Sequence, residues 1–545
     1  MKSAVKTKRT HAQDGAFRSP RIKNLKTGLK KTQNRDILNI SNLLQELKNK
    51  MTEQTASQIP EQKPEDIFEQ RKAKIDEFSK AGLKPFGKRF DGAISTAEAR
   101  ALFVPDAETE PAVRIAGRMT AFRAMGKAVF ADVKDSSGRM QIYVQRDTVG
   151  EDFFKLFKKF DIGDLIGVDG VLFQTRTGEI TVKATACTLL SKSLRPLPEK
   201  YHGLTDMEAR YRQRYLDLIM NDESRAVLRK RSTIIKEIRQ YLDDKGYMEV
   251  ETPMLQYIPG GAAANPFKTH YNALDTDMYL RIATELSLKK LLVGGYEKVY
   301  EINRNFRNEG MDRRHNPEFT AIELYQAYGN CETMMELVED LIKTVAMRVN
   351  GTLVIKAGGK EIDLGKPWRR VAYRDLVREV AGENWFELSR EEKYKKAKEL
   401  GTQVLPDWTD LEITHEIYEK LVEDTLIEPT FVTRLPAELV PLARKCEDDP
   451  SLVDVYELEI NGQEISPGYT ELNDPIDQRQ RFMDQVTLSG KDPAQAVDED
   501  FLTALEYGMP PTGGMGMGID RLVMLLTGAE SIRDVILFPQ LRPRA

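Results

Sequence analysis

The sequence predicts an α+β protein in which a small β-barrel precedes a larger domain of strands and helices. Residues 112–191 contain short runs in which apolar and polar residues alternate, which is the period of a half-buried strand. Two further hairpins are predicted around residues 299–325 and 455–465. Apolar residues recur at helical spacing between Ser224 and Lys245, so helices accompany these strands.

Composition restricts the class of protein. The chain has 545 residues, of which 41% are hydrophobic and 30% charged, with 81 basic and 85 acidic side chains. This composition supports a large core and excludes a mainly disordered or collagen-like chain. No run approaches about 18 apolar residues, and no basic segment precedes an apolar one, so we expect neither a membrane partner nor a secretory signal. Cys187, Cys331 and Cys446 lie far apart and form no CxxC pair, which indicates a reducing, cytoplasmic location.

Residues 1–63 are predicted to be a basic extension without stable structure. The first 50 residues contain 13 Lys and Arg but only three acidic side chains. Three interpretations remain open: sequence upstream of a true start at Met51, a weak organellar transit peptide, or an arm that wraps RNA.

Residues 64–111 are predicted to be a helical segment. Apolar residues recur there at helical spacing, and Gly82 provides a stop signal. The apolar positions are Ile67, Phe68, Ile75 and Phe78.

Residues 112–191 are predicted to form a barrel of the OB type. One hairpin joins the strands 129–133 and 140–144 through the turn 135–138, and a second turn falls at Thr177 and Gly178. Several short strands within about 80 residues are typical of such barrels.

The alternation also predicts which side chains leave the barrel core. With Val129 and Met140 facing inward, Phe130, Gln141 and Tyr143 face outward. Two aromatic rings and an amide offer stacking and hydrogen bonding to the bases of a single-stranded nucleic acid. An ordinary pair of half-exposed aromatic residues is the alternative interpretation.

Residues 192–222 are predicted to be a charged, proline-containing hinge before a large domain at 223–545. That domain opens with the helix at 224–245 and a strand at 248–252, which Pro253 closes because proline cannot donate to a strand ladder.

A long hairpin carries the first candidate site. Strands at 299–309 and 319–325 flank a polar loop, and odd-numbered residues on both strands share one face if the register pairs odd with odd. This face suits a ligand with a phosphate, a flat ring and an amine, although a solvated charged sheet is the alternative. Its odd-numbered polar and aromatic residues are Arg307, Glu309, Phe319, Glu323 and Tyr325. The loop adds Arg313, Arg314 and His315, which suit a terminal phosphate.

The segment 513–521 alternates glycine with other residues and ends in Arg521. Glycines at every second position clear one strand face, so a flat ligand can lie against the backbone. Arg521 falls in the first turn of the following helix, and we therefore favour a nucleotide site over close sheet packing alone. The pattern is neither a dinucleotide fingerprint nor a phosphate loop.

A third hairpin is predicted to hold a metal ion. The dipeptide Asn461-Gly462 predicts a two-residue turn that pairs residue 459 with 464 and residue 457 with 466. Glu457, Glu459 and Glu464 then project from one face, where their like charges call for a cation. Oxygen ligands favour Mg²⁺. Three solvated glutamates are the alternative.

Taken in order, these segments resemble the three signature motifs of the class II aminoacyl-tRNA synthetases. The second motif matches as F-R-N-E at 306–309 and the third as G-x-G-x-G-x-D-R at 514–521. The barrel is similar to that of the subclass for lysine, aspartate and asparagine, and the longer strings resemble the lysyl-tRNA synthetase family from about residue 65 to the end. These strings are 215–219, 249–254, 258–264, 303–310, 314–320 and 533–539.

The resemblance implies an antiparallel catalytic sheet flanked by helices, with a helical insertion at about 370–430. It also implies the following roles. Arg307 and Arg521 would be catalytic; ATP would be bound by Arg307, Glu309, His315, Asn316, Phe319 and Arg521; lysine by Gly261, Glu285, Glu323, Tyr325, Tyr469 and Glu471; Mg²⁺ by Glu457 and Glu464; and the anticodon by Phe130, Gln141 and Tyr143.

The implied activity is ATP-dependent ligation of L-lysine to tRNA(Lys) through lysyl-adenylate, by a homodimer formed at the first motif. Glu285, Glu323 and Tyr325 fit a lysine ammonium, whereas an aspartate pocket needs the opposite charge. The alternatives are an aspartyl- or asparaginyl-tRNA synthetase, a relative that transfers lysine to a protein, and a non-catalytic RNA-binding regulator. Relatives that modify proteins lack the barrel.

The chain also departs from the family pattern. Pro467 stands where asparagine is usual, so one side-chain contact with substrate is lost. Ser287 replaces a usual tyrosine, Val440 a usual serine and Glu459 a usual apolar aromatic residue. These four positions affect the pocket and metal site more than the reaction class.

Overall fold

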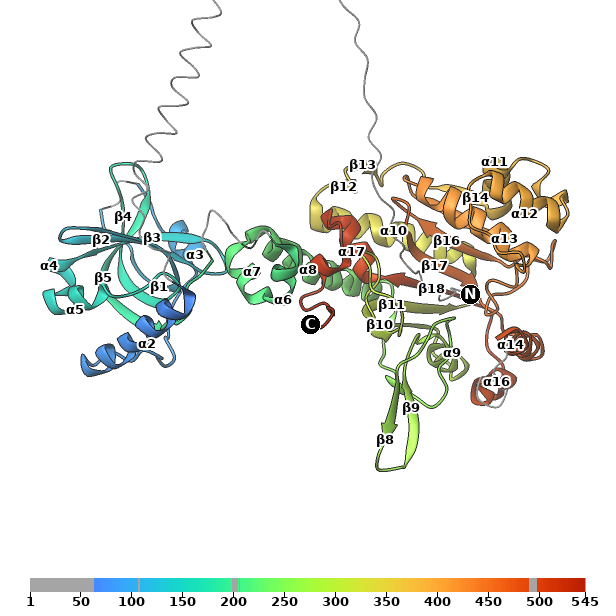
Figure 1. The fold of residues 1–545 in the computed structure, drawn as a ribbon, viewed down its shortest axis with the longest axis horizontal. Coiled ribbons are helices and arrows are strands. Elements are labelled where there is room, and N and C mark those ends of the chain that lie inside the picture. The colour runs from blue at the N-terminus through green and yellow to red at the C-terminus, as the bar shows by residue number, and fades with distance from the viewer. Residues whose placement is uncertain (1–62, 106–107, 199–203, 205, 490–496, 545) are drawn as a thin grey trace, which may run out of the picture. The chain divides into compact units, whose positions relative to one another are not determined.

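The computed structural model describes residues 63–105, 108–198, 204, 206–489 and 497–544. They form two compact units, one ending before residue 204 and one beginning there. Except for Lys63, the predicted basic extension lies outside the described residues. Figure 1 labels the helices and strands of both units.

The first unit is a closed five-stranded barrel with the strand order β1-β2-β3-β5-β4. β3 and β5 pair in parallel, and the other pairs are antiparallel. Its elements are α2 (Pro64–Lys80), α3 (Thr96–Ala101), β1 (Ala112–Met125), β2 (Ala128–Lys134), β3 (Arg139–Gln145), α4 (Arg146–Val149), α5 (Glu151–Phe157), β4 (Leu165–Gln174) and β5 (Ile180–Ser191). The predicted barrel is therefore confirmed.

The barrel core follows the alternation in the sequence. Val129, Val133, Met140 and Val144 are fully buried, because every second residue of β2 and β3 points inward. The helix α2 packs its Phe78 into the same core. Its end is marked by a left-handed glycine two residues later, as predicted.

The second unit is built on an eight-stranded sheet with the order β14-β15-β16-β17-β18-β11-β10-β6. Only the edge pairs β14-β15 and β10-β6 are parallel. The sheet strands are β6 (Met248–Glu249), β10 (Lys298–Phe306), β11 (Glu318–Ala327), β14 (Arg369–Ala372), β15 (Thr430–Thr433), β16 (Val455–Glu459), β17 (Glu464–Thr470) and β18 (Thr512–Gly518).

Two smaller sheets and a set of helices complete this unit. The small sheets contain β7 (Leu255–Gln256), β8 (Lys268–Tyr271) and β9 (Thr276–Leu280), and β12 (Val354–Ala357) and β13 (Lys360–Asp363). The α-helices are α6 (Met207–Arg212), α7 (Arg214–Met220), α8 (Asp222–Asp244), α9 (Glu285–Val293), α10 (Cys331–Asn350), α11 (Tyr373–Ala381), α12 (Arg390–Glu399), α13 (Asp410–Ile417), α14 (Pro475–Ser489), α16 (Glu499–Glu506), α17 (Ile519–Thr527) and α18 (Ile532–Val535). No helix among the described residues is both long and apolar enough to cross a bilayer.

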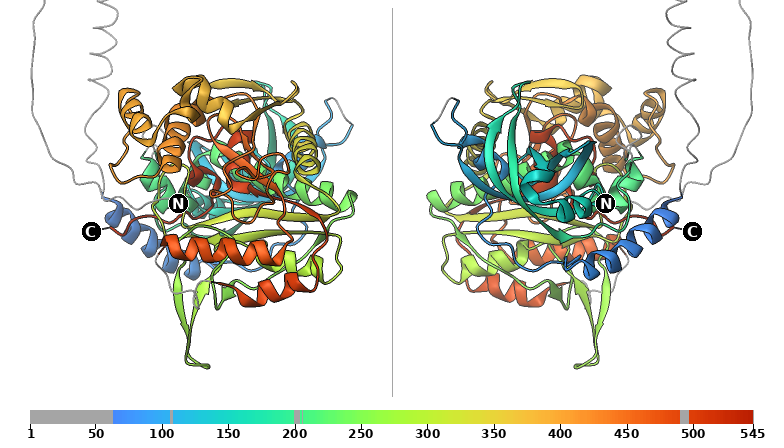
Figure 2. Two further views of the ribbon diagram at one scale, coloured as in Figure 1. Left: turned by 90° about the vertical axis from the view of Figure 1, so that its right-hand side faces the viewer. Right: turned by 90° about the vertical axis from the view of Figure 1, so that its left-hand side faces the viewer.

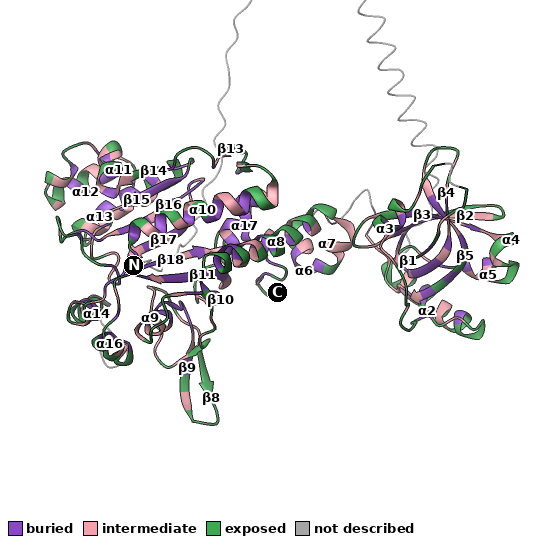
Figure 3. Cartoon of the chain, turned by 180° about the vertical axis from the view of Figure 1, so that it is seen from behind, coloured by how far each residue is buried: buried purple, intermediate pink, exposed green. Residues whose placement is uncertain are grey.

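The two faces of the large sheet have different covers. One face, here called the core face, buries Leu324, Tyr456, Leu458 and Met515 against α8, α10 and α17. Figure 3 shows the resulting buried residues along β11, β17 and β18, in contrast to the exposed β8. Apolar side chains at every second position drive this packing, which is the main source of stability in such a layered fold.

The opposite face, here called the site face, is covered only at its two ends. At one end Val371, Val432 and Val455 pack against α11 and α13 of the helical insertion. At the other end Val299 and Tyr325 pack against α9 and α16, and α16 lies beside α14 (Figure 2). The middle of the site face therefore lies between two apolar clusters.

The hairpin β10–β11 has the predicted register. Glu301 pairs with Glu323 and Asn305 with Phe319, so odd residues pair with odd residues. The predicted strand to Glu309 is wrong, because β10 ends at Phe306. Beyond it the amide of Asn308 donates to the carbonyl of Asn265, outside the ladder, at 2.7 Å.

The hairpin β16–β17 partly departs from the prediction. Asn461 and Gly462 form the turn with positive φ angles of 59° and 63°, and Glu459 pairs with Glu464 as predicted. Glu457, however, pairs with Pro467 rather than Ser466, because a β-bulge shifts the register by one residue. The sequence gives no local signal for this bulge.

The first motif forms less strand than predicted. The strand expected at 248–252 is limited to Met248 and Glu249, which pair in parallel with β10 at the edge of the sheet.

A buried ion pair and its hydrogen bonds join α8, β11 and α17 on the core side. Arg231 of α8 pairs with Asp520 of α17 and donates to Thr320 Oγ1 at 2.9 Å. Asp520 in turn accepts a hydrogen bond of 2.7 Å from the amide of Thr320 on β11. These contacts fix α17, and with it Arg521, relative to the hairpin β10–β11.

We predict that Arg231→Met lowers the free energy of unfolding by about 3–5 kcal/mol, because it leaves the carboxylate of Asp520 buried without its charge partner. Urea unfolding measures this loss. The matched control is Lys236→Met on the exposed side of α8, which should change stability by less than about 0.5 kcal/mol. Equal effects of the two substitutions would contradict the prediction.

Candidate active site

Carboxyl groups and glycines alternate across the middle of the site face. Glu323 of β11 pairs with Gly516 on one side and with Glu301 on the other. A Cβ at Gly516 would lie 3.8 Å from the ring of Pro467 on β17. The sheet therefore brings Glu323 and Pro467 together over the glycine strand β18.

The glycines of β18 keep this face clear of side chains. Met515 and Met517 point into the core face, so Gly514, Gly516 and Gly518 lie on the site face. A Cβ at Gly514 would lie only 2.5 Å from the ring of Tyr325. The space over Gly514 is thus filled by protein side chains, whereas a Cβ at Gly516 would meet nothing nearer than 3.8 Å.

Three carboxyl groups and one ammonium group are buried together beside Tyr325. Glu285, Glu323 and Glu471 are 6%, 9% and 1% exposed, and Lys289 is completely buried. The Nζ of Lys289 lies 2.7 Å from Oε1 of Glu285 and 2.5 Å from Oε2 of Glu471. The amide of Thr284 donates to Glu323 at 3.2 Å.

This cluster has more negative than positive charge. Burial, together with repulsion from Glu285, raises the pKa of Glu323 to about 7. Burial also raises the pKa of Glu471, although Lys289 opposes the shift. The pKa of the Tyr325 hydroxyl rises for the same reasons, burial first and then the nearby carboxylates. A cationic ligand would relieve these shifts.

Several buried polar atoms of this face lack hydrogen-bond partners within the described part of the chain. They are Oδ1 of Asn303, Oδ1 of Asn305, Nε of Arg307, Oε2 of Glu323 and both carboxylate oxygens of Glu471. Folded proteins leave few such atoms unsatisfied, since each costs about 1–3 kcal/mol. Their concentration on one sheet face therefore indicates a binding site for a polar ligand.

The loop after β10 brings further predicted residues together. The guanidinium carbon of Arg307 lies 5.1 Å from the centre of the Phe319 ring. Arg521 donates to the carbonyl of Glu464 at 2.6 Å, and its other terminal nitrogen lies 3.3 Å from Nε2 of His315. One arginine thus lies over an aromatic ring and a second contacts a histidine of the loop, and both kinds of group suit a nucleotide.

Two residues of the predicted ATP site form hydrogen bonds with residues that do not belong to that predicted site. The side-chain amide of Asn316 donates to the carbonyl of Glu318 at 2.5 Å and to Gln540 at 2.6 Å. The exposed Glu309 accepts a hydrogen bond of 3.4 Å from the amide of Asn265. The amide of Asn316 therefore ties the loop to the C-terminal segment.

Gly261 approaches the carboxyl cluster through its backbone. Its φ angle is +85°, and a Cβ there would lie 3.3 Å from the Cβ of Glu285. Glycine is therefore needed for both conformation and space.

The predicted metal ligands lie next to a buried third carboxyl group. Glu457 and Glu464 are half-buried, whereas Glu459 is only 1% exposed. Burial, followed by repulsion from Glu464 and Glu457, raises the pKa of Glu459 to about 10. Across the described ranges, no three acidic, histidine or cysteine side chains are arranged to hold a metal ion by themselves.

The barrel presents the predicted aromatic pair on its outer surface. The rings of Phe130 and Tyr143 are 4.8 Å apart, and both residues are half-buried. The hydroxyl of Thr181 donates a hydrogen bond of 3.0 Å to the side-chain amide oxygen of Gln141. The ring of Phe173 lies 6.0 Å from Tyr143 and extends this aromatic surface.

The sequence analysis missed Phe173 and Lys289. Phe173 belongs to the hairpin predicted at Thr177 and Gly178, but the parallel pairing of β5 with β3, the strand of Tyr143, was not predicted. Lys289 had a usable signal, because it follows Glu285 by four residues on one helix and so lies on the same face.

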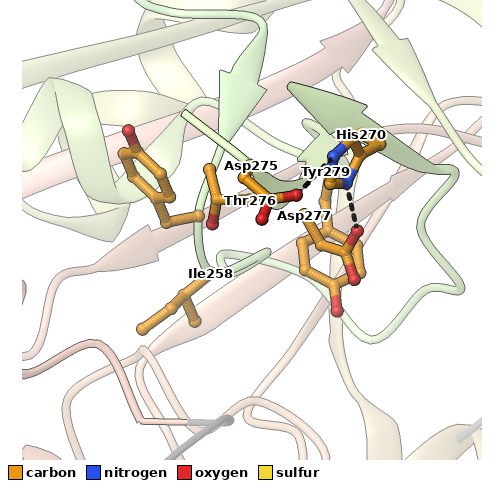
Figure 4. Close-up of a pocket in the computed structure, with 7 residues that line it drawn as sticks. Ile258, His270, Asp275, Thr276, Asp277 and Tyr279 are labelled. Atoms are coloured by element: carbon orange, nitrogen blue, oxygen red, sulfur yellow. Dashed lines mark hydrogen bonds and ion pairs between the residues drawn. The ribbon is translucent and has the colours of Figure 1, made fainter. Parts of the chain in front are cut away.

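A separate hollow of about 540 Å³ lies along the β8–β9 hairpin. Figure 4 shows His270 between two carboxylates, with Nδ1 3.0 Å from Asp277 and Nε2 3.4 Å from Asp275. None of the residues lining this hollow is a predicted site residue.

Comparison with protein-family models identifies the class. Residues 206–542 match the family described as "tRNA synthetases class II (D, K and N)". Residues 113–190 match the OB-fold nucleic acid binding domain. The chain therefore belongs to the class II tRNA synthetases of the aspartate, lysine and asparagine group, as its motifs indicated.

Individual relatives narrow this assignment. The chain is 53% identical over 467 residues to the lysine–tRNA ligase of Syntrophomonas wolfei, which covers 85% of this chain and 94% of that protein. It is 52% identical over 470 residues to the lysine–tRNA ligase of Bacillus subtilis, with 85% and 94% covered. The lysine–tRNA ligase of Pelotomaculum thermopropionicum is 53% identical over 467 residues, with 85% and 92% covered.

We predict that Gly514→Ala lowers the free energy of unfolding by about 1–3 kcal/mol, because its Cβ would collide with Tyr325 and Glu471. Chemical denaturation measures the change. The control is Gly138→Ala in the barrel, where the nearest atom is at an ordinary 3.6 Å. Full stability of the Gly514 variant would show that the carboxyl cluster moves aside freely.

Proposed function

We propose that the chain is a lysine–tRNA ligase, which activates L-lysine with ATP and transfers it to the 3′ end of tRNA(Lys). The observation that carries the proposal is the buried carboxyl cluster with its deficit of positive charge, next to an arginine with an unsatisfied Nε. The level of identity to the lysine–tRNA ligases supports it.

The carboxyl cluster is the proposed amino-acid pocket. An ε-ammonium group would meet Glu323 and the hydroxyl of Tyr325, with Glu285, Glu471, Tyr469 and the backbone of Gly261 completing the pocket. A buried ammonium group requires charged and hydrogen-bonding partners of this kind. An aspartate side chain would be repelled by the same groups, which disfavours the aspartyl and asparaginyl alternatives.

The basic residues around Phe319 are the proposed ATP site. The adenine ring would lie between Phe319 and Arg521, along the open strand β18. Glu309, Asn316 and His315 would contact the rest of the nucleotide. Arg307 would hold the α-phosphate beside the lysine carboxylate, where its unsatisfied Nε can donate.

Glu457 and Glu464 are the proposed ligands of Mg²⁺. Burial, followed by repulsion from Glu464 and Glu457, raises the pKa of Glu459, and three neighbouring carboxyl groups are a donor set that fits a divalent cation. Since the described residues contain no group of three side chains able to hold a metal ion, the remaining ligands would come from phosphate oxygens and water. When bound, Mg²⁺ would neutralise charge on the phosphates.

In the proposed reaction the lysine carboxylate attacks the α-phosphate in line, and pyrophosphate leaves. Arg307 and Arg521 act as fixed positive charges that stabilise the developing negative charge. No protein nucleophile is required, since positioning in the two adjoining sites supplies the rate enhancement. A 3′-hydroxyl of tRNA then attacks the adenylate carbonyl, an ester forms, and AMP leaves as the acyl–phosphate bond breaks.

The barrel surface is the proposed anticodon site. Phe130 and Tyr143 would stack on bases, and Gln141 would hydrogen-bond to a base edge. The aromatic neighbour Phe173 enlarges the stacking surface beyond the predicted pair.

We further propose a homodimer and a cytoplasmic location. Met248, Met254 and Leu255 are 41%, 48% and 46% exposed around the edge strand β6, which is the first motif. Exposed apolar side chains at a sheet edge suit an interface between two copies of the chain. The three cysteines are unpaired and buried, which suits a reducing compartment.

The proposed function predicts pyrophosphate exchange that depends on L-lysine but not on L-aspartate or L-asparagine. Arg307→Ala should lower the rate of pyrophosphate exchange at least about a hundredfold, because no arginine then opposes the negative charge that develops on the α-phosphate. The assay is ³²P exchange with purified protein, and circular dichroism checks folding.

Exchange with aspartate would reject the pocket assignment. Absence of adenylate with every amino acid, in a folded protein that still binds RNA, would favour a non-catalytic regulator. Retained activity in a folded Arg307→Ala protein would contradict the role proposed for Arg307 but not the proposed function.

Lysine binding should weaken as the pH falls from about 8 to about 6. The pKa of Glu323 is near 7 without ligand, and an ammonium group favours the ionised carboxylate, so binding releases protons. Each proton released changes Kd by up to about tenfold per pH unit. Calorimetry in two buffers of different ionisation enthalpy counts the protons released on binding. No proton release at pH 7 would contradict the proposed lack of positive charge in the carboxyl cluster.

A further inference from the structure

Lys289 is a completely buried cation inside the proposed amino-acid pocket. Its ammonium group contacts Glu285 at 2.7 Å and Glu471 at 2.5 Å, two residues that reach it from α9 and from the chain just beyond β17. Burial alone would lower the pKa of Lys289, but the two carboxylates raise it above its ordinary value. Lys289 therefore remains charged.

The contacts of Lys289 divide the oxygens of Glu471 between two tasks. Oε2 forms the ion pair with Lys289, while Oε1 faces away from that pair, and neither oxygen has a hydrogen-bond partner among the described residues. Because a carboxylate pinned at one oxygen has a fixed orientation, the other oxygen is held ready for a donor from a ligand. Lys289 thus positions Glu471 without occupying its second oxygen.

Lys289 also sets the charge of the pocket. When a bound cation keeps all three carboxyl groups ionised, Lys289 and Arg307 leave a net charge of about −1 by simple count. Free lysine has two ammonium groups and one carboxylate, so its net charge is +1. The charges of pocket and ligand then balance, whereas without Lys289 the pocket would match a dication.

We propose that Lys289 is a positioning and specificity-determining residue, which selects an amino acid of single net positive charge over a dicationic amine of the same length. This inference rests on the proposed function, since it concerns the same pocket. The excluded ligand class comprises lysine analogues without a carboxylate, which cannot be activated and would block the enzyme.

The test compares L-lysine with L-lysinol, in which a hydroxymethyl group replaces the carboxylate and the net charge is +2. The variants are Lys289→Met and Lys289→Gln, which remove the charge, and Lys289→Arg, which keeps it. The matched control is Lys290→Met, because Lys290 is partly exposed and pairs outside the pocket with Asp500 at 2.6 Å. Calorimetry at constant pH gives both dissociation constants.

We expect the ratio of the Kd for lysine to the Kd for lysinol to rise at least about tenfold in both neutral variants, because an uncompensated buried carboxylate favours the dication. Lys289→Arg and Lys290→Met should keep the ratio of the unsubstituted protein. A purely structural role would weaken both ligands equally and leave the ratio unchanged.

An unchanged ratio in the neutral variants would overturn the inference, and so would the failure of both neutral variants to fold. Either result leaves the proposed function intact if the unsubstituted protein binds L-lysine. If that protein does not bind L-lysine, the proposed function itself fails.

Discussion

The site depends on negative charge that the protein itself does not fully compensate. Three carboxyl groups share one buried ammonium group, and burial of an unpaired charge is among the costliest arrangements in a protein. The raised pKa values of Glu323 and Glu471 express this cost. A cationic substrate is the group that lowers it, so affinity and selectivity have a single physical origin.

Such a cluster can persist because the rest of the sheet is strongly stabilised. The core face buries apolar side chains against three helices, while Arg231 and Asp520 join the motifs beneath the site. The two ends of the site face are also closed by apolar packing. A rigid frame therefore holds the polar groups in place before the ligand arrives, which is what electrostatic stabilisation of a transition state requires.

The glycines of β18 connect this frame to the chemistry. Because Gly514 and Gly516 have no side chains, Tyr325, Glu471 and Glu323 can occupy the space above the strand. The adjoining open strand leads to Arg521, which lies in the first turn of the next helix. The proposed amino-acid pocket and the proposed nucleotide site are thus neighbours on one strand, as an attack of one ligand on the other demands.

Much of this arrangement could be predicted from local patterns. The alternation of residues in β2 and β3 identified the barrel core. For β10 and β11 it gave the shared face only on the condition that odd residues pair with odd residues, and the structure meets that condition. The register of Glu457 was not predictable in this way, because a bulge moves it by one residue without changing the hydrophobic pattern. The end of β10 likewise depended on a hydrogen bond to Asn265, from a different part of the chain.

The sequence by itself determined the class of fold and the signature motifs, since these follow from residue type and local period, while the acidic pocket residues were implied by the family resemblance. Only the tertiary structure decided that Lys289 contacts both Glu285 and Glu471, and that Phe173 lies beside Tyr143. Each contact joins elements of one unit, and the distance between those elements is set by the packing of that whole unit. The balance of charge in the pocket therefore becomes visible only when the chain is folded.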